Sequence, residues 1–397
     1  MYSRGIATFG LDYGKCPKWL FERMVKLSRE MIEVMIQEYG PDEFIKRIAD
    51  PVWFQSLGTV LAFDWNASGL TTTLTAALKE AVRGREEEFG IFICGGKGKT
   101  SRKTPQEILG WGHVLNLPFE EANQLVYNSK MVAKVDNSLV QDGFQIYHHT
   151  FFFSHPPAGG GSWAVVQQGM NTKEVTARRY HWFSDSLKFH SLAGSDSLVI
   201  EPHQGIVAQK KEKVLNLVAQ QSVTTQEVSV ELVNQNFQSL LKEVKLLTKY
   251  SSDLSQMIKI GNRKQQLTLL NLENKEFKTH PVLKEDFLGN KYLEKILYQL
   301  TEEKPKNYES LLATYGVGPK TVRALALVAE VIYGAKPSYE DPARYSFAHG
   351  GKDATPYPVD RVTYDKTINL INQLVLKTKL PPRVKDKMIR NAFRMKG

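Results

Sequence analysis

The sequence is 397 residues long, which is more than one hydrophobic core usually organises, so we expect two or three domains. Its two cysteines, Cys16 and Cys94, cannot form a disulfide framework or hold a four-cysteine iron–sulfur cluster. No apolar run is long enough to span a bilayer, and the N-terminus lacks the apolar segment of a signal peptide. The expected location is therefore the cytoplasm, without a membrane partner.

The net charge of +10 is concentrated toward the C-terminus. From Gly316 to Gly397 there are fifteen Lys or Arg residues against seven Asp or Glu residues. Such an excess favours a polyanionic partner, with DNA as our expectation. The alternative is a solvated basic surface that has no partner.

The N-terminal part predicts an α/β layer. Residues 17–38 have the apolar spacing of a long amphipathic helix. Residues 59–64 and 90–94 are apolar runs typical of buried strands, and the helical stretch 70–82 between them predicts a βαβ unit. Further helices are expected over 105–114 and 119–136. Residues 145–153 and 163–168 predict an antiparallel strand pair.

The second predicted strand continues into a basic loop at residues 95–105, Gly-Gly-Lys-Gly-Lys-Thr-Ser-Arg-Lys-Thr-Pro. Its Gly98-Lys99-Thr100 matches the end of a P-loop, but Ile93 occupies the place of the first glycine. We therefore favour contacts with phosphate or a nucleic-acid backbone over ATP hydrolysis, with a flexible surface loop as the alternative. The candidate DNA contacts here are Lys97, Lys99, Arg102 and Lys103.

Residues 178–182, Arg-Arg-Tyr-His-Trp, combine cations with aromatic rings. This mixture suits stacking on a nucleic-acid strand, and a strand with one polar face explains it equally well. Histidines are frequent in this region, but none has the His-x-x-x-His or Glu-x-x-His spacing of a metal site. We expect neither a metal nor a cofactor.

From about residue 212 the sequence becomes helical and amphipathic, with helices expected over 226–247 and 283–300. The predicted fold class is thus α+β and multidomain. Residues 1–211 form an N-terminal α/β domain with a small mixed or antiparallel sheet. Residues 212–397 form an all-α domain.

Within that second domain, residues 315–333 begin with Tyr-Gly-Val-Gly-Pro-Lys-Thr and continue as an apolar helix. The glycines suit a tight turn and Pro319 suits the first helical position, while residues 308–313 predict a short helix before the turn. This arrangement resembles the helix-hairpin-helix motif of the DNA glycosylases of that name. The alternative is a simple corner in which the glycines relieve strain.

The resemblance implies a DNA-binding domain in which the backbone N–H groups of the turn hold a phosphate. It places DNA contacts at Gly316, Val317, Gly318, Thr321 and Arg323.

The same resemblance implies a catalytic pair, Lys320 and Asp360. Lys320 matches the hairpin lysine of lyase-capable glycosylases, whose amine forms a Schiff base with the sugar. Asp360, within Pro-Val-Asp-Arg, resembles the carboxylate that stabilises an oxocarbenium-like sugar. The alternatives are that Asp360 caps a helix and Lys320 contacts phosphate, or that Asp353 or Asp365 is the acid.

The forty residues from Lys320 to Asp360 exceed the spacing in those glycosylases, and an insertion at 335–357 accounts for the excess. The insertion mixes aromatic, charged and glycine residues, as loops that reach a substrate do; the alternative is a loop folded back on its own domain. Further candidate DNA contacts here and next to Asp360 are Arg344, Tyr345, His349, Lys352 and Arg361.

The whole chain resembles a prokaryotic family designated domain of unknown function 763. The elements that carry this resemblance are F-D-W-N-A-S-G, G-G-K-G-K-T-S-R-K-T-P, V-V-Q-Q-G-M-N, R-R-Y-H-W and G-V-G-P-K-T-V-R-A-L-A-L-V-A-E-V-I-Y-G with the F-A-H-G-G-K-D that follows.

The leading functional prediction is a DNA-repair glycosylase, with or without AP-lyase activity. The alternatives are a non-catalytic DNA-structure-binding protein and a metal-dependent nuclease that uses Asp64 or Glu80. Neither the lesion, the strand preference nor the oligomeric state follows from the sequence.

Overall fold

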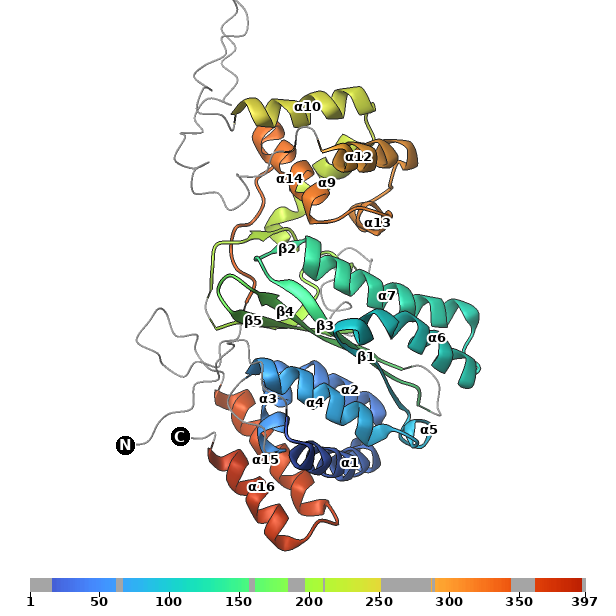
Figure 1. Cartoon of the computed structure of the whole chain (residues 1–397), viewed down its shortest axis with the longest axis vertical. Helices are drawn as coiled ribbons and strands as arrows, with labels where there is room; N and C mark the ends of the chain where they lie inside the picture. Colours follow the sequence, from blue (N-terminus) through green and yellow to red (C-terminus); the bar gives the residue numbers. More distant parts are fainter. Residues whose placement is uncertain are drawn as a thin grey trace, which may run out of the picture.

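The computed structural model describes residues 16–61, 67–156, 161–184, 197–209, 211–250, 287, 290–343 and 361–394. It is an α+β protein in which helices lie on both sides of an antiparallel sheet (Figure 1).

The sheet has five strands in the order β1-β3-β4-β5-β6, and each neighbouring pair is antiparallel. The strands are β1 (Ile91–Lys97), β3 (Gln145–Ser154), β4 (Trp163–Asn171), β5 (Thr176–Phe183) and β6 (His203–Val207). Two helices cover the upper face in Figure 1, α6 (Thr104–Val114) and α7 (Phe119–Ser138). A separate two-stranded sheet joins β2 (Val140–Gln141) to β7 (Leu215–Asn216).

A lower helical layer covers the other face of the sheet (Figure 1). It comprises α1 (Lys18–Tyr39), α2 (Pro41–Ala49), α3 (Pro51–Val60), α4 (Ala67–Val82), α15 (Arg361–Lys377) and α16 (Pro382–Arg394). Ile371 and Leu374 of α15 share a hydrophobic core with Met31 and Leu57 of the N-terminal helices. Residues 361–394 come from the part of the sequence expected to form the helical domain, yet they pack on α1 and α3.

An upper helical layer lies beyond α7 (Figure 1). It comprises α9 (Val223–Val233), α10 (Phe237–Tyr250), α12 (Lys291–Glu303), α13 (Tyr308–Ala313) and α14 (Pro319–Tyr333). Its core is continuous with the upper face of the sheet, because Leu297 and Leu325 belong to the same apolar cluster as Val135 and Trp182.

Several predicted elements are confirmed. The antiparallel pair β3–β4, helices α6 and α7, and the helix–turn–helix of α13 and α14 all form where the sequence placed them. The helix expected over 226–247 is instead two helices, because the chain breaks at residues 234–236 between α9 and α10.

The βαβ prediction is wrong. Thr59 and Val60 end helix α3 instead of starting a strand, and β1 pairs antiparallel with β3. A short apolar run cannot be assigned to strand or helix by periodicity alone. Here the Asp50 side chain accepts the backbone N–H groups of Val52 and Trp53, so it caps the helix in which the run begins, at Thr59 and Val60.

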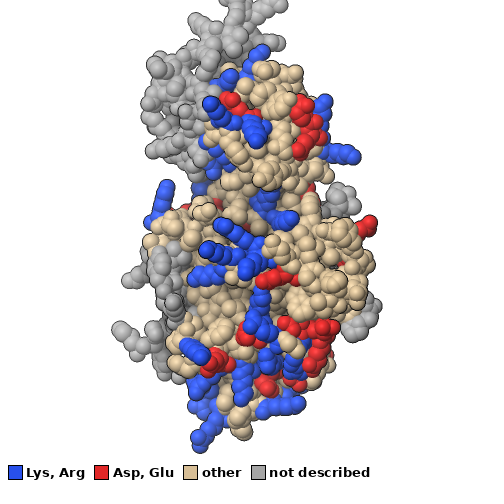
Figure 2. Space-filling model, turned by 45° about the vertical axis from the view of Figure 1, so that its right-hand side comes forward, with Lys and Arg blue, Asp and Glu red and all other residues tan. Residues whose placement is uncertain are grey.

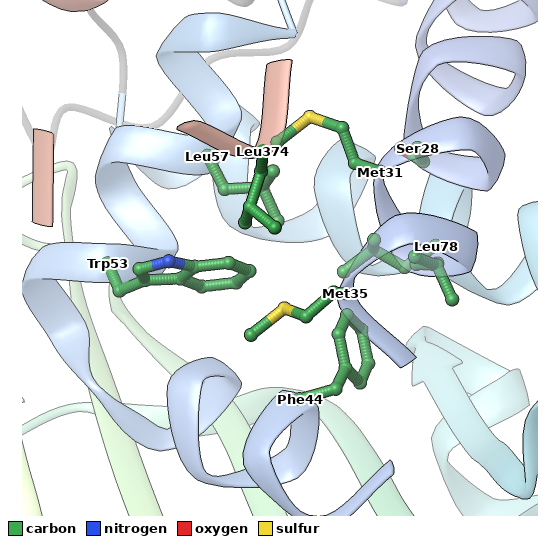
Figure 3. A pocket seen from close by; sticks show the side chains of 9 residues that line it. Ser28, Met31, Met35, Phe44, Trp53, Leu57, Leu78 and Leu374 are labelled. Atoms are coloured by element: carbon green, nitrogen blue, oxygen red, sulfur yellow. The ribbon is translucent and has the colours of Figure 1, made fainter. Parts of the chain in front are cut away.

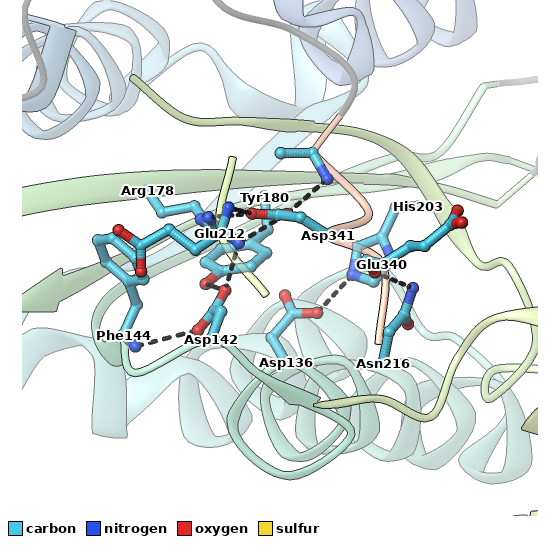
Figure 4. Close-up of polar contacts among 11 residues, drawn as sticks. Asp136, Asp142, Phe144, Arg178, Tyr180, His203, Glu212, Asn216, Glu340 and Asp341 are labelled. Carbon is cyan, nitrogen blue, oxygen red and sulfur yellow. Dashed lines mark hydrogen bonds and ion pairs between the residues drawn. The ribbon is translucent and has the colours of Figure 1, made fainter. Parts of the chain in front are cut away.

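A buried ion cluster fixes the segment that follows α14 to the sheet (Figure 4). Arg178 of β5 donates to Asp142 at 3.0 Å and to both carboxylate oxygens of Asp341 at 3.0 and 2.8 Å. All three side chains are buried. The Asp341 carboxylate also accepts the backbone N–H of Glu212 at 2.9 Å, so it joins two distant segments.

A second buried carboxylate, Asp136 of α7, binds neighbouring strands of the same sheet (Figure 4). It accepts the Gln167 amide at 2.5 Å, the Trp182 indole N–H at 3.0 Å and the His203 ring at 2.5 Å. These bonds hold α7 to β4, β5 and β6.

We predict that Asp341→Asn lowers the free energy of unfolding by about 1.5–3 kcal/mol, because Arg178 keeps Asp142 as its ion partner but loses a charged hydrogen-bond acceptor. Chemical denaturation of the purified variant measures the change. The matched control is Glu340→Gln at the neighbouring exposed position, whose free energy of unfolding should stay within about 0.5 kcal/mol of the wild type. Equal losses of unfolding free energy in both variants would contradict the role of Asp341 as a partner of Arg178.

Candidate nucleic-acid interface

The turn between α13 and α14 has the backbone that the glycines were expected to supply. Gly316 has φ +85°, a conformation that side-chain-bearing residues rarely adopt. Gly318 is the N-cap of α14, and Pro319 follows at its first position. Asn307 forms a capping box with Ser310, which fixes the start of α13.

The space in front of Gly318 is open, since an added Cβ would meet nothing within 4 Å. The first N–H groups of any helix have no acceptor within that helix, and they carry the positive end of its dipole. A backbone that can be approached at this point is therefore suited to an anion such as phosphate.

The carbonyl groups of the turn accept hydrogen bonds from the protein itself. Lys134 of α7 donates to the Thr314 carbonyl at 2.7 Å, and Gln141 of β2 donates to the Pro319 carbonyl at 3.0 Å. The Tyr292 hydroxyl of α12 lies 3.4 Å from the Gly316 carbonyl. These donors neutralise the oxygens that would otherwise repel an approaching anion.

Lys134 and Gln141 were not found by sequence reasoning, since neither belongs to a motif. Burial lowers the pKa of the Lys134 amine to about 8. Gln141 also accepts from the Arg323 guanidinium at 2.6 Å, so Arg323 is tied to the sheet side of α14.

The candidate residues of the turn between α13 and α14, here called the hairpin, differ in how far their side chains are exposed. The side chains of Val317 and Thr321 are buried, so these two residues can offer a ligand only backbone groups. Lys320 is half-buried in the first turn of α14. In contrast, the Tyr315 side chain is 88% exposed.

The basic loop is a 3-10 turn, η1 (Gly98–Lys103), at the end of β1. It is not a P-loop, because α6 begins at Thr104 and not at Lys99. The four candidate cations Lys97, Lys99, Arg102 and Lys103 are exposed.

The basic turn contacts β3, and β3 packs against α7, the helix that also contacts the hairpin. Lys97 lies opposite His148 on β3, and its amine is 5.8 Å from the centre of the Tyr147 ring. The next residue along β3, Ile146, donates its backbone N–H to Asn137 of α7 at 3.2 Å. Figure 2 shows Lys and Arg side chains gathered across the middle of one face, between the upper and lower parts of the molecule.

Of the two residues expected to form a catalytic pair, the structure describes Lys320 but not Asp360. Asp360 lies outside the described residues, and so do five other candidates: Arg344, Tyr345, His349, Lys352 and Asp353. Helix α15 begins at Arg361. The structure describes only the backbone of Arg361 and Asp365. The helix that follows Asp360, α15, contacts α1, α3 and α16, whereas Lys320 belongs to the upper helical layer. The two helices thus lie in different layers (Figure 1).

Residues 178–182 do not form a nucleic-acid surface. Arg178 and Arg179 are buried on opposite faces of the sheet, Arg178 beside Asp142 and Arg179 beside Thr71 and Gln55. The alternative interpretation as a strand is correct.

A row of polar residues crosses the lower face of the sheet. Lys97, His148, Gln168 and Arg179 lie directly opposite one another on four neighbouring strands. The last three are buried, and burial lowers the pKa of His148 to about 3, so its ring is neutral. Three of the four come from stretches that carry the family resemblance, although the sequence did not show that they meet.

Other candidate sites are less suited to chemistry. Within the described ranges, no group of three or more His, Cys, Asp or Glu residues is placed to hold a metal ion, and Glu80 pairs with Arg83 at 3.0 Å. Asp64 lies outside those ranges. A cavity of about 10 Å³ between α1 and α3 is lined by Met31, Met35, Trp53 and neighbouring residues, which leaves room for one water molecule at most (Figure 3).

We predict that Gly316→Ala destabilises the protein by about 2–5 kcal/mol, because its Cβ would lie 2.4 Å from Ile296 Cδ1 at a positive φ. Gly84→Ala is the matched control, since Gly84 has φ +78° and nothing within 4 Å, and it should cost only about 1–2 kcal/mol. Adding Ile296→Val, which removes Cδ1, should recover part of the difference. Equal costs for both alanine variants in denaturation experiments would contradict the steric account.

Comparison with known proteins gives a family but no relative of known activity. Searches of curated proteins and of solved structures found no match. In the part of the chain that is described, no helix is both long and apolar enough to cross a membrane. A family model described as a protein of unknown function, DUF763, matches residues 5–359. The chain belongs to the DUF763 family.

Proposed function

We propose that this protein binds DNA through the hairpin between α13 and α14, which holds a backbone phosphate. The observation that carries the proposal is the open backbone at Gly318, at the N-terminus of a fifteen-residue helix. A site made of N–H groups contacts phosphate without regard to base, so it supplies affinity and position but no sequence specificity.

The basic turn is the second grip in this proposal. Lys97 ends β1, and Lys99, Arg102 and Lys103 lie in the turn that connects β1 to α6. Helix α6 packs on α7, the helix that supports the hairpin. Each phosphate neutralised by a cation releases counterions, so binding should weaken steeply as salt increases.

We expect Gly318→Ala to weaken DNA binding at least tenfold, since its methyl group would occupy the space that a phosphate approaches. Fluorescence anisotropy with a labelled oligonucleotide measures this at several salt concentrations. The matched control is Gly110→Ala in α6, where an added Cβ also meets nothing and φ is not positive. Both variants should stay folded, and unchanged affinity in Gly318→Ala would refute the hairpin as the phosphate site.

A base-excision activity is the second candidate function. Two amines lie at the hairpin, Lys320 in the first turn of α14 and Lys134, whose nitrogen is 2.7 Å from the Thr314 carbonyl. With a pKa of about 8, Lys134 is uncharged more often at neutral pH than an ordinary lysine, as a Schiff-base nucleophile needs. The base would have to leave the stack before either amine could attack the sugar.

Borohydride trapping on DNA that contains a damaged base or an abasic site tests this activity. A lyase that uses Lys320 predicts a covalent adduct that Lys320→Ala abolishes and Lys134→Arg retains. An adduct that persists in Lys320→Ala excludes Lys320 as the nucleophile. Absence of any adduct across a panel of lesions leaves the binding role, and cleavage that EDTA suppresses indicates a metal-dependent nuclease.

A further inference from the structure

The hairpin carries an aromatic side chain, Tyr315, that is not packed in the core. Tyr315 is 88% exposed, more than any other large hydrophobic side chain among the described residues. Its φ is not positive, so its backbone conformation suits any residue. Neither the turn nor the core therefore explains a tyrosine at this position.

Tyr315 immediately precedes the glycine turn proposed to hold phosphate. A second exposed ring, Tyr292 of α12, is 61% exposed, and its hydroxyl reaches the Gly316 carbonyl. The hairpin thus presents aromatic surface beside a backbone anion site, with Lys320 in the helix that follows. Phosphate, aromatic and cationic contacts together are the usual means of binding an unpaired nucleic-acid strand.

We propose that Tyr315 stacks on a nucleobase whose face is free, an inference that rests on the proposed function. The hairpin would therefore prefer DNA with unpaired bases. In a continuous duplex, neighbouring base pairs cover both faces of every base, so the ring finds no partner there. A gap, a frayed end or a single strand offers a free base face next to a backbone phosphate. Tyr315 is then a specificity-determining residue for DNA structure and not for sequence.

The energetics favour this occupant. A tyrosine ring that becomes covered removes a large apolar area from water, and stacking on a base is favourable for every base type. An apolar protein partner would gain less here, because it would cover the open N-terminal end of α14 without offering acceptors to its N–H groups.

Anisotropy measurements on three matched DNAs test the inference: a continuous duplex, the same duplex with a short gap, and the single strand. We expect the wild type to prefer the gapped and single-stranded DNA. Tyr315→Ala should lower affinity for those two by about 5- to 100-fold and leave the duplex unchanged. Tyr315→Phe, which keeps the ring, should stay within about twofold of the wild type on all three.

Tyr333→Ala is the matched control, because Tyr333 is also exposed but ends the same helix, roughly 20 Å from Pro319. It should not change any of the affinities. As a direct reading of stacking, Tyr315→Trp should show fluorescence quenching, relative to the wild type, with gapped DNA and not with duplex.

The outcomes separate this inference from the proposal on which it rests. If the wild type binds DNA and Gly318→Ala weakens that binding, the proposed function holds. A uniform loss on all three DNAs in Tyr315→Ala, or no loss on any, then overturns the stacking inference alone. Failure of the wild type to bind any of the DNAs overturns both.

Discussion

The buried guanidinium of Arg178, held between Asp142 and Asp341, fixes the path of the chain between its layers. The chain leaves the upper helical layer at the end of α14 and reaches Asp341 beside β5, and α15 lies in the lower layer. A buried charge that loses its partner is costly, so the segment around Asp341 is held at one position along the sheet. The segment that follows α14 is thereby anchored to the sheet.

The N-terminal end of α14 is fixed by a different set of contacts. Lys134 and Gln141 extend from α7 and β2 to the turn carbonyls, and Asp136 holds α7 itself to the sheet. The carbonyls face the protein while the backbone at Gly318 faces open space. Residues far away in sequence therefore determine which way the carbonyl groups of the hairpin point. A glycine turn without these hydrogen-bond donors would not be preorganised for an anion.

Local signals made much of this protein predictable. The Gly-Val-Gly-Pro pattern gave the start of α14 correctly, and alternation together with a Pro/Gly turn gave β3 and β4. Tertiary context decided the rest: a strand was expected from residue 59, where α3 ends, and the nucleic-acid interpretation of residues 178–182 fails because both cations of β5 are buried. The supports of the hairpin and the layer to which α15 belongs depend on contacts that no sequence pattern records.

The layers also limit how a base-excision reaction could be organised. Because α15 packs on α1 and α3, that helix is separated by the sheet from the amines of Lys320 and Lys134. Two described carboxylates do contact the hairpin region: Glu303 accepts the Thr314 hydroxyl at 2.9 Å, and Glu309 accepts the Tyr127 hydroxyl at 2.7 Å. A reaction at this turn would need a carboxylate within reach of the same sugar as the amine, whereas a phosphate clamp with a stacking ring needs neither acid nor amine. The proposed binding role thus requires fewer groups to be placed together than a base-excision reaction does, and it accounts for more of the contacts at the hairpin.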